Sequence, residues 1–316
     1  MIAFGPVPSR RLGRSLGINN IPSKFCSYSC VYCQLGRTLG MDVVRREFYA
    51  PDRILKKVRR QIENAYTGGE SIDYLTFVPD GEPTLDVNLG REIELLRPLG
   101  IKIAVITNAS LFGRKDVQAD LMQADWVSLK VDSVRQNCWR KMNRPHRALR
   151  LNSLLAGMLE FGRKFKGELV TETMLVKGVN GHASPLKEIA AFIGRLEPAR
   201  AYVAIPTRPP SEKWVKPPGE DIINLAFQIF KEKIDSVEYI IGYEGNDFAL
   251  TGNVVDDLLN ITAVHPMRED AVNEFLMRAE ADWMLVHRLI AQARMIEAGF
   301  AGWKFYLRRL PESPGS

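Results

Sequence analysis

The feature that most constrains the fold is a regular alternation of short apolar segments with longer amphipathic ones. The apolar, β-branched segments cover residues 15–21, 73–78, 102–108, 125–132, 168–178 and 200–205. Apolar residues at helical spacing fill stretches between them, at 51–69, 87–97, 146–165, 184–196 and 219–234. Strands that alternate with helices in this way predict βαβ units and a parallel sheet. Six repeats fit an open doubly wound sheet or a barrel of the β/α type.

The pattern changes after about residue 245. Two helices are expected at 268–280 and 282–300, with Ile296 on the apolar face of the second and Gly299 as its end, followed by a strand at 304–310. Two helices and a hairpin strand outline a small winged-helix-like domain. We therefore predict a partial (β/α)6 barrel over 1–245 and an accessory domain over 246–316. Within the barrel, Ser184 is the expected N-cap of the helix that begins there.

Composition and charge limit the compartments and partners to be expected. The chain has 316 residues, no run of apolar residues long enough to span a membrane, and an N-terminus unlike a secretory signal. We therefore expect a cytoplasmic protein. The formal net charge of +6 permits an anionic partner such as nucleic acid but does not require one.

Three of the four cysteines lie close together in the stretch KFCSYSCVYCQLGRT, as Cys26-x3-Cys30-x2-Cys33. Clustered thiols in a reducing compartment bind metal or do redox chemistry more often than they form disulfides. Structural zinc usually takes four protein ligands, and no histidine lies nearby, so three thiolates leave one coordination position open. The alternative is a zinc or redox site completed by Cys138.

This spacing after the first predicted strand, with Tyr32 before the last cysteine, resembles the signature of the radical S-adenosylmethionine (SAM) superfamily. The longer stretches GPVPSRRLGRSLGINNI and DGEPTL resemble its Fe–S oxidoreductase group, which is related to tRNA wyosine synthases. The resemblance implies that Cys26, Cys30 and Cys33 bind three irons of a 4Fe–4S cluster and that SAM chelates the fourth iron. It also implies that Tyr32 borders the adenine.

The turn Asp80-Gly81-Glu82-Pro83 resembles the Gly-Gly-Glu-Pro motif with which the family binds the amino group of SAM. Asp80 replaces the first glycine, and a carboxylate beside an ammonium group is favourable. We expect Asp80, Gly81 and Glu82 to contact the cofactor. A plain Asp-Gly turn is the structural alternative.

Polar residues also stand where other predicted strands end, which is where β/α barrels keep their sites. By resemblance, the expected cofactor-binding residues are Asn108, Ser128, Lys130 and Asp132. Lys130, Asp132 and Arg144 are the expected catalytic residues. A structural ion pair between Lys130 and Asp132 is the alternative for those two. Glu172, Thr207 and Arg208 are further polar residues expected at the barrel interior or mouth.

The function predicted from the resemblance is reductive cleavage of SAM, which generates a 5′-deoxyadenosyl radical that abstracts hydrogen from a substrate. The substrate could be anionic or of the tRNA type, and the partners would be SAM, a reductant such as flavodoxin or ferredoxin, and a nucleic acid or protein substrate. Two alternatives remain: an iron–sulfur redox sensor that binds DNA, and an activase that makes a glycyl radical on a partner protein.

Overall fold

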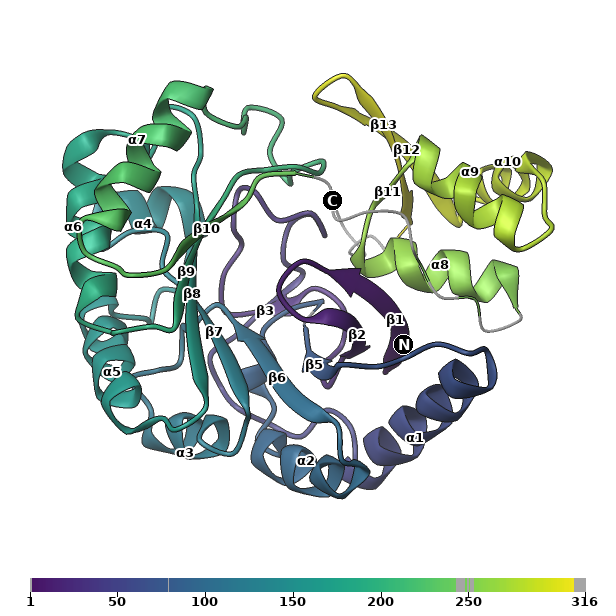
Figure 1. Cartoon of the computed structure of the whole chain (residues 1–316), viewed down its shortest axis with the longest axis horizontal. Coiled ribbons are helices and arrows are strands. Elements are labelled where there is room, and N and C mark those ends of the chain that lie inside the picture. Colours follow the sequence, from purple (N-terminus) through teal and green to yellow (C-terminus); the bar gives the residue numbers. More distant parts are fainter. Residues whose placement is uncertain (1, 79, 243–247, 249, 251–252, 310–316) are drawn as a thin grey trace.

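An eight-stranded sheet forms the frame of the computed structural model, which describes residues 2–78, 80–242, 248, 250 and 253–309. In spatial order its strands are β1 (Ala3–Ser9), β2 (Gly13–Ile18), β5 (Tyr74–Phe77), β6 (Lys102–Thr107), β7 (Trp126–Lys130), β8 (Glu168–Met174), β9 (Arg200–Ala204) and β10 (Val237–Ile240). β1 pairs with β2 antiparallel, whereas all the following neighbours are parallel. The sheet curls into a half-barrel (Figure 1).

Helices cover the outer side of this sheet (Figure 1). They are α1 (Pro51–Thr67), α2 (Leu89–Leu96), α3 (Lys115–Leu121), α4 (Gln136–Asn143), α5 (Leu151–Lys164), α6 (Ala183–Gly194) and α7 (Glu220–Lys231), with 3₁₀ turns η1 (Pro83–Leu85) and η2 (Arg97–Leu99). In the large sheet, each of the parallel strands β2, β5, β6, β7, β8 and β9 is followed along the chain by at least one helix. This confirms the six predicted βα units. β1 and β10 are additional strands that flank them.

The parallel strands are buried on both faces, because helices cover the outer face and side chains fill the inside of the barrel. In β6, Ile103 and Val105 belong to the main core under the helices, and Ala104 belongs to a separate cluster inside the barrel with Trp126 and Tyr202. On the helix side, α1 buries residues at helical spacing, namely Ile54, Val58, Ile62 and Ala65.

The C-terminal unit has its own core, built around Phe248, Phe275 and Leu258. Its elements are α8 (Val254–Val264), β11 (Met267–Arg268), α9 (Glu269–Arg278), α10 (Trp283–Ala291), β12 (Met295–Phe300) and β13 (Trp303–Arg308), and its antiparallel sheet has the order β11-β13-β12. The unit packs against β1, whose Val7 joins the C-terminal core. Its assignment to the winged-helix fold stays a prediction, and the predicted boundary at 245/246 lies outside the described residues.

Two local predictions were wrong. The helix expected at 282–300 ends at Ala291, and Ile296 and Gly299 lie in β12, where pairing with β13 outweighs the helical spacing of the sequence. Ser184 is not an N-cap, because α6 begins at Ala183 and His182 takes the cap position. Within the described residues, no helix has the length and apolar character needed to span a membrane.

Candidate active site

The three clustered cysteines lie in the long loop that connects β2 to α1. Cys26 belongs to the short strand β3 (Phe25–Cys26), which pairs with β4 (Gly40–Met41). Between them the chain turns twice, with Cys33 N donating to Cys30 O at 3.1 Å and Gly36 N donating to Cys33 O at 3.2 Å. Cys26, Cys30 and Cys33 consequently line one small cavity of about 70 Å³, together with Asp80 and Gly81.

The sulfur atoms receive hydrogen bonds from neighbouring groups. Asn108 Nδ2 donates to Cys26 Sγ at 3.3 Å, and Asn143 Nδ2 donates to Cys30 Sγ at 3.5 Å. Burial raises the pKa of the Cys30 thiol to about 12, and it raises the pKa of Cys26 and Cys33 as well. Thiolates in this loop therefore need a bound cation, such as the irons of a cluster, to compensate their buried charge.

The donor set fits a cluster better than a single ion. Among the described residues, no three His, Cys, Asp or Glu side chains converge as ligands of one metal ion. A 4Fe–4S cube does not need such convergence, because each thiolate binds a different iron. Cys138 does not line the cysteine cavity; its side chain packs with Val31, Met142 and Val176 and donates to Met142 Sδ at 3.8 Å. This separation argues against the predicted alternative in which Cys138 completes a zinc or redox site.

The Asp80-Gly81-Glu82 turn contacts the cysteine loop directly. Lys24 N donates to Asp80 O at 2.6 Å, and Glu82 N donates to Phe25 O at 3.1 Å. A Cβ at Gly81 would lie 1.8 Å from Phe25 O, so no larger residue fits without moving the loop. Asp80 is 6% exposed, and burial raises the pKa of its carboxyl to about 7.

The two carboxyl groups of this turn differ in how many partners they have. Asp80 Oδ2 accepts from Asn19 Nδ2 at 3.1 Å, but Asp80 Oδ1 is buried with no hydrogen-bond partner among the described residues. Glu82 accepts from Thr84 N, Thr84 Oγ1, Thr107 Oγ1 and Asn108 N. Asp80 thus has acceptor capacity for a ligand, while Glu82 joins the turn to the end of β6.

Tyr32, Asp132 and Asn143 form a second polar group beside the cysteines. The Tyr32 hydroxyl donates to Asp132 Oδ2, and Asn143 Nδ2 donates to the same oxygen at 2.7 Å. Asp132 Oδ1 accepts from Met174 N at 2.9 Å. Asp132 therefore fixes Tyr32 and Asn143, and its predicted contact with cofactor or substrate stays a prediction.

The alternative ion pair between Lys130 and Asp132 was wrong. Lys130 Nζ pairs instead with Glu172 Oε1 across the β7–β8 boundary, and Arg11 Nη1 pairs with Glu172 Oε2 at 2.5 Å. Burial alone would lower the pKa of Lys130, but the Glu172 carboxylate raises it above the usual value. The Lys130 ammonium keeps its proton and lies over the Tyr32 ring, 5.1 Å from its centroid.

The remaining predicted residues are placed as follows. Asn108 bridges Cys26 and Ser27, with its Nδ2 3.1 Å from Ser27 Oγ. Ser128 is buried within β7. Arg144 pairs with Glu212 at 2.6 Å and lines neither the cysteine cavity nor the barrel cavity described next, so its catalytic role stays a prediction.

A cavity of about 290 Å³ opens inside the barrel next to the cysteine loop. Its lining combines Tyr32, Cys33 and Gln34 with polar residues that include Arg10, Arg11, Glu172 and Arg208, and with apolar residues that include Ile106 and Met174. Arg208 Nη1 donates to Gln34 Oε1 at 2.9 Å, and its Nη2 contacts the His265 ring at the end of α8. Gln34 of this cavity and Asn143 at the end of α4 were not foreseen, because single amides give no distinctive sequence pattern.

The comparisons with known proteins agree with this arrangement. The sequence profile of the Radical SAM superfamily matches residues 20–192, which include the cysteine loop and the 80–82 turn. The chain belongs to the radical SAM superfamily. It is therefore a radical SAM enzyme, as the sequence predicted.

Among full-length relatives of this radical SAM enzyme, UPF0026 protein MJ1312 of Methanocaldococcus jannaschii is 47% identical over 98% of this chain and 96% of its own length. A radical SAM methyltransferase from Sphaerobacter thermophilus has a TM-score of 0.55 at 16% identity, over 72% of this chain and 66% of that one. TYW1 with a lysine-pyruvate adduct bound has a TM-score of 0.50 at 15% identity, over 70% of this chain and 74% of that one. The two structural similarities show a shared fold.

Proposed function

We propose that Cys26, Cys30 and Cys33 hold a 4Fe–4S cluster and that SAM binds between the cysteine loop and the 80–82 turn. The observation that carries this proposal is the opening of three cysteine side chains on one cavity that Asp80 and Gly81 also line. When bound, the cluster supplies one electron that splits the sulfonium C–S bond of SAM into methionine and a 5′-deoxyadenosyl radical. We place the reaction in the cytoplasm, with flavodoxin or ferredoxin as the electron source.

The polypeptide positions the cofactor. Asp80 Oδ1 has no other partner among the described residues, so it accepts a hydrogen bond from the methionyl ammonium group. Gly81 keeps the turn close to Phe25, and the Glu82–Asn108 hydrogen bond sets Asn108 against Cys26. Tyr32, fixed by Asp132, forms a wall for the adenine.

The barrel cavity supports an anionic substrate. Arg10, Arg11 and Arg208 line it, and Glu172 is the only Asp or Glu among the described residues that line it. Guanidinium groups bind carboxylates and phosphates in two-point geometry, and the apolar wall keeps water from the radical. The Lys130 ammonium, which stays protonated, adds positive charge beside Tyr32. Such a substrate would be an organic acid, a phosphorylated compound or an RNA nucleotide.

Reductive cleavage of SAM tests this proposal. The protein is reconstituted anaerobically with iron and sulfide, reduced with dithionite, and assayed for 5′-deoxyadenosine. We expect product from the wild type and from Cys138→Ala, and none from the variant with Cys26, Cys30 and Cys33 all changed to alanine. Equal product from the wild type and the triple variant would contradict the proposal. The DNA-binding sensor alternative predicts no cleavage by any of the three proteins.

A further inference from the structure

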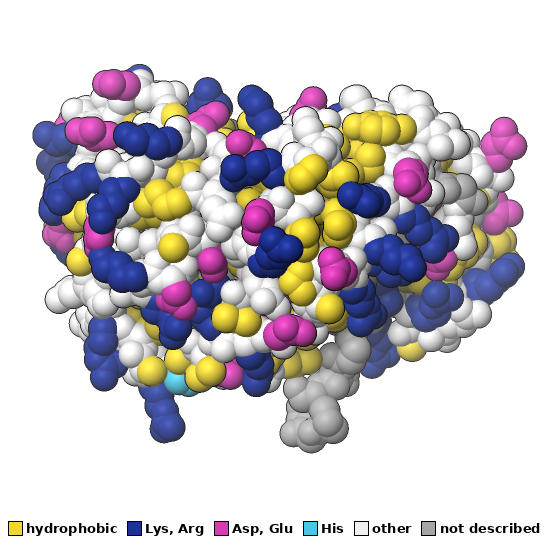
Figure 2. Space-filling model, turned by 90° about the horizontal axis from the view of Figure 1, so that it is seen from below, with side chains coloured by type: hydrophobic (Ala, Val, Ile, Leu, Met, Phe, Trp, Pro, Cys, Tyr) yellow, Lys and Arg dark blue, Asp and Glu magenta, His cyan; other side chains and the backbone are white. Residues whose placement is uncertain are grey.

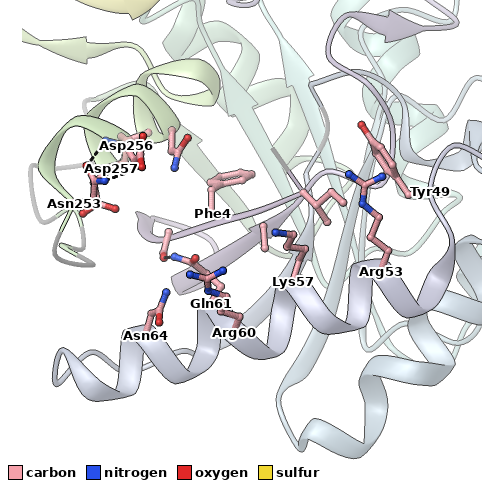
Figure 3. Close-up of a pocket in the computed structure, with 15 residues that line it drawn as sticks. Phe4, Tyr49, Arg53, Lys57, Arg60, Gln61, Asn64, Asn253, Asp256 and Asp257 are labelled. Carbon is pink, nitrogen blue, oxygen red and sulfur yellow. Dashed lines mark hydrogen bonds between the residues drawn. The ribbon is translucent and has the colours of Figure 1, made fainter.

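A second cavity lies outside the barrel, between helix α1 and helix α8 of the C-terminal unit. Its volume is about 590 Å³, and its floor is formed by Ile2 and by Ala3 and Phe4 of the edge strand β1. Figure 3 shows that side chains of α1 line one side and that Asn253, Asp256 and Asp257 of the α8 region line the other. Cavities of about 300–1,000 Å³ are typical of small-molecule sites.

The α1 wall carries a row of positive charge. Arg53, Lys57 and Arg60 all line the cavity, and they follow one another at intervals of four and three residues on the same side of the helix. None of the three forms an ion pair with a residue that the structure describes; Arg53 only stacks on Tyr49, at 5.4 Å from the ring centroid. With a rise of about 1.5 Å per residue, the row is about 10 Å long.

Further basic side chains lie outside this row. Figure 2 shows Lys and Arg side chains on both sides of the face that it draws, with Asp and Glu side chains among them. Lys56 and Arg59 are also exposed on α1 but are not among the cavity-lining residues. The helix thus carries three cations that line the cavity and two, Lys56 and Arg59, that do not, and only the first set can surround a ligand.

The α8 wall has the opposite character. Asp256 and Asp257 lie there with Asn253 and Asn260, and Asn253 Nδ2 donates to Asp256 Oδ2 at 2.8 Å. Carboxylates accept hydrogen bonds and repel a second anion. A ligand that fills the cavity therefore needs an anionic group at one end and hydroxyl or amino donors at the other.

We propose that this cavity binds a nucleotide, with its phosphates on Arg53, Lys57 and Arg60 and its ribose hydroxyls or base amino group toward Asp256. Guanidinium and ammonium groups bind phosphate oxygens by charge-assisted hydrogen bonds. The nucleotide is either free or one unit of an RNA strand. This site is separate from the SAM site and goes beyond the proposed function.

The cavity nevertheless lies close to the active site. Phe48, which precedes the cavity-lining Tyr49, packs edge-to-face on Phe25 beside Cys26, with the ring centroids 5.0 Å apart. Tyr49 lies at the end of the cavity opposite Asn64 and α8 (Figure 3). A strand whose nucleotide occupies the cavity would thus continue from Tyr49 toward the cysteine loop.

Equilibrium binding to the full chain tests this proposal. Isothermal titration calorimetry measures the affinity for the four ribonucleoside 5′-diphosphates, for inorganic pyrophosphate and for a short single-stranded RNA oligomer. We expect a nucleoside diphosphate to bind more tightly than pyrophosphate, because only the nucleotide has donors for Asp256. RNA that binds at least about tenfold more tightly than every diphosphate indicates a strand, and comparable affinities indicate a free nucleotide.

The decisive variants share one helix. Lys57→Gln combined with Arg60→Gln should weaken nucleotide or RNA binding at least about tenfold, and the matched control Lys56→Gln combined with Arg59→Gln should weaken it less than about twofold. Equal losses in the two variants, or no binding of any probe by the wild type, would overturn the proposal. Unchanged thermal unfolding confirms that both variants fold. Because neither pair contacts the cysteine cavity, cleavage of SAM should be unaltered in both, so this test fails or succeeds independently of the proposed function.

Discussion

Replacing Glu82 by glutamine tests the interpretation that this carboxylate joins the 80–82 turn to the end of β6. Glu82 is fully buried, and its Oε1 accepts from Thr84 N, Thr84 Oγ1 and Thr107 Oγ1, whereas its Oε2 accepts from Asn108 N at 2.8 Å. Both backbone N–H groups can only donate. Although burial raises the pKa of Glu82, the donors around it therefore favour the ionised form.

The magnitude follows from these bonds. Glutamine keeps one oxygen for the three donors near Oε1, but each bond loses its charge assistance, which together costs about 2 kcal/mol. Its amide nitrogen then faces Asn108 N, so a buried donor loses its acceptor, at a further cost of about 1–3 kcal/mol. We expect Glu82→Gln to lower the free energy of unfolding by about 3–5 kcal/mol, a large share of the stability of a typical domain.

Urea unfolding followed by circular dichroism measures the change. The matched control is Glu94→Gln, which removes an exposed carboxylate whose ion pair with Arg91 is 2.7 Å long and solvent-screened, so its effect should be below about 1 kcal/mol. A loss of less than about 1 kcal/mol for Glu82→Gln would refute the reasoning, because it would mean that Glu82 is protonated or replaceable in the fold.

Three further outcomes are expected. Cys138→Ser should retain wild-type iron content and SAM cleavage, since Cys138 does not line the cysteine cavity; loss of iron on colorimetric assay would contradict this placement. Glu172→Gln leaves the Lys130 ammonium and the Arg11 guanidinium without their shared carboxylate, so it should lower the free energy of unfolding in urea by about 3–5 kcal/mol. This loss should exceed that of Lys130→Met, and the reverse order would refute the ion-pair assignment. Burial, and after it the Asp86 charge, raises the pKa of Glu92, so the contribution of Glu92 to stability is present at low pH and is lost as pH rises through the folded-state pKa. Glu92→Gln should reduce the slope of stability against pH by up to about 1.4 kcal/mol per pH unit, and an unchanged slope would argue that Glu92 titrates normally.

The barrel could be predicted because its signal is local and repeated. Each βα unit places its own apolar run and amphipathic helix in sequence, and the residues of α1 that face the sheet follow the helical period without interruption. The flanking strands gave no such signal. β1 contains Pro6 and Pro8, which argue against a strand except at a sheet edge, and β10 has four residues only.

The cysteine site could be predicted because its ligands are close in sequence, whereas its surroundings depend on closure of the barrel. Arg11 and Glu172 form an ion pair although they are far apart along the chain, and no sequence pattern around either residue indicates the other as its partner. The same holds for Lys130, whose partner comes from the adjacent strand instead of from Asp132 two residues away. Such pairings follow from strand order and register, which a single sequence does not specify.

The cavity between α1 and α8 could not be predicted from the sequence. The basic residues of α1 were visible as a charged helix face, which is most simply explained by solvation. Helix α8 was not predicted, so the acidic wall opposite that face was not foreseen. Only the packing of the C-terminal unit on β1 turns one side of the helix into the wall of a cavity.

Mössbauer spectroscopy of protein reconstituted with ⁵⁷Fe tests the central claim most directly. The account predicts four irons per chain, one of which changes its spectrum when SAM is added while the other three, bound by Cys26, Cys30 and Cys33, do not. Four irons whose spectra are all unchanged by SAM, or zinc in place of iron, would contradict it.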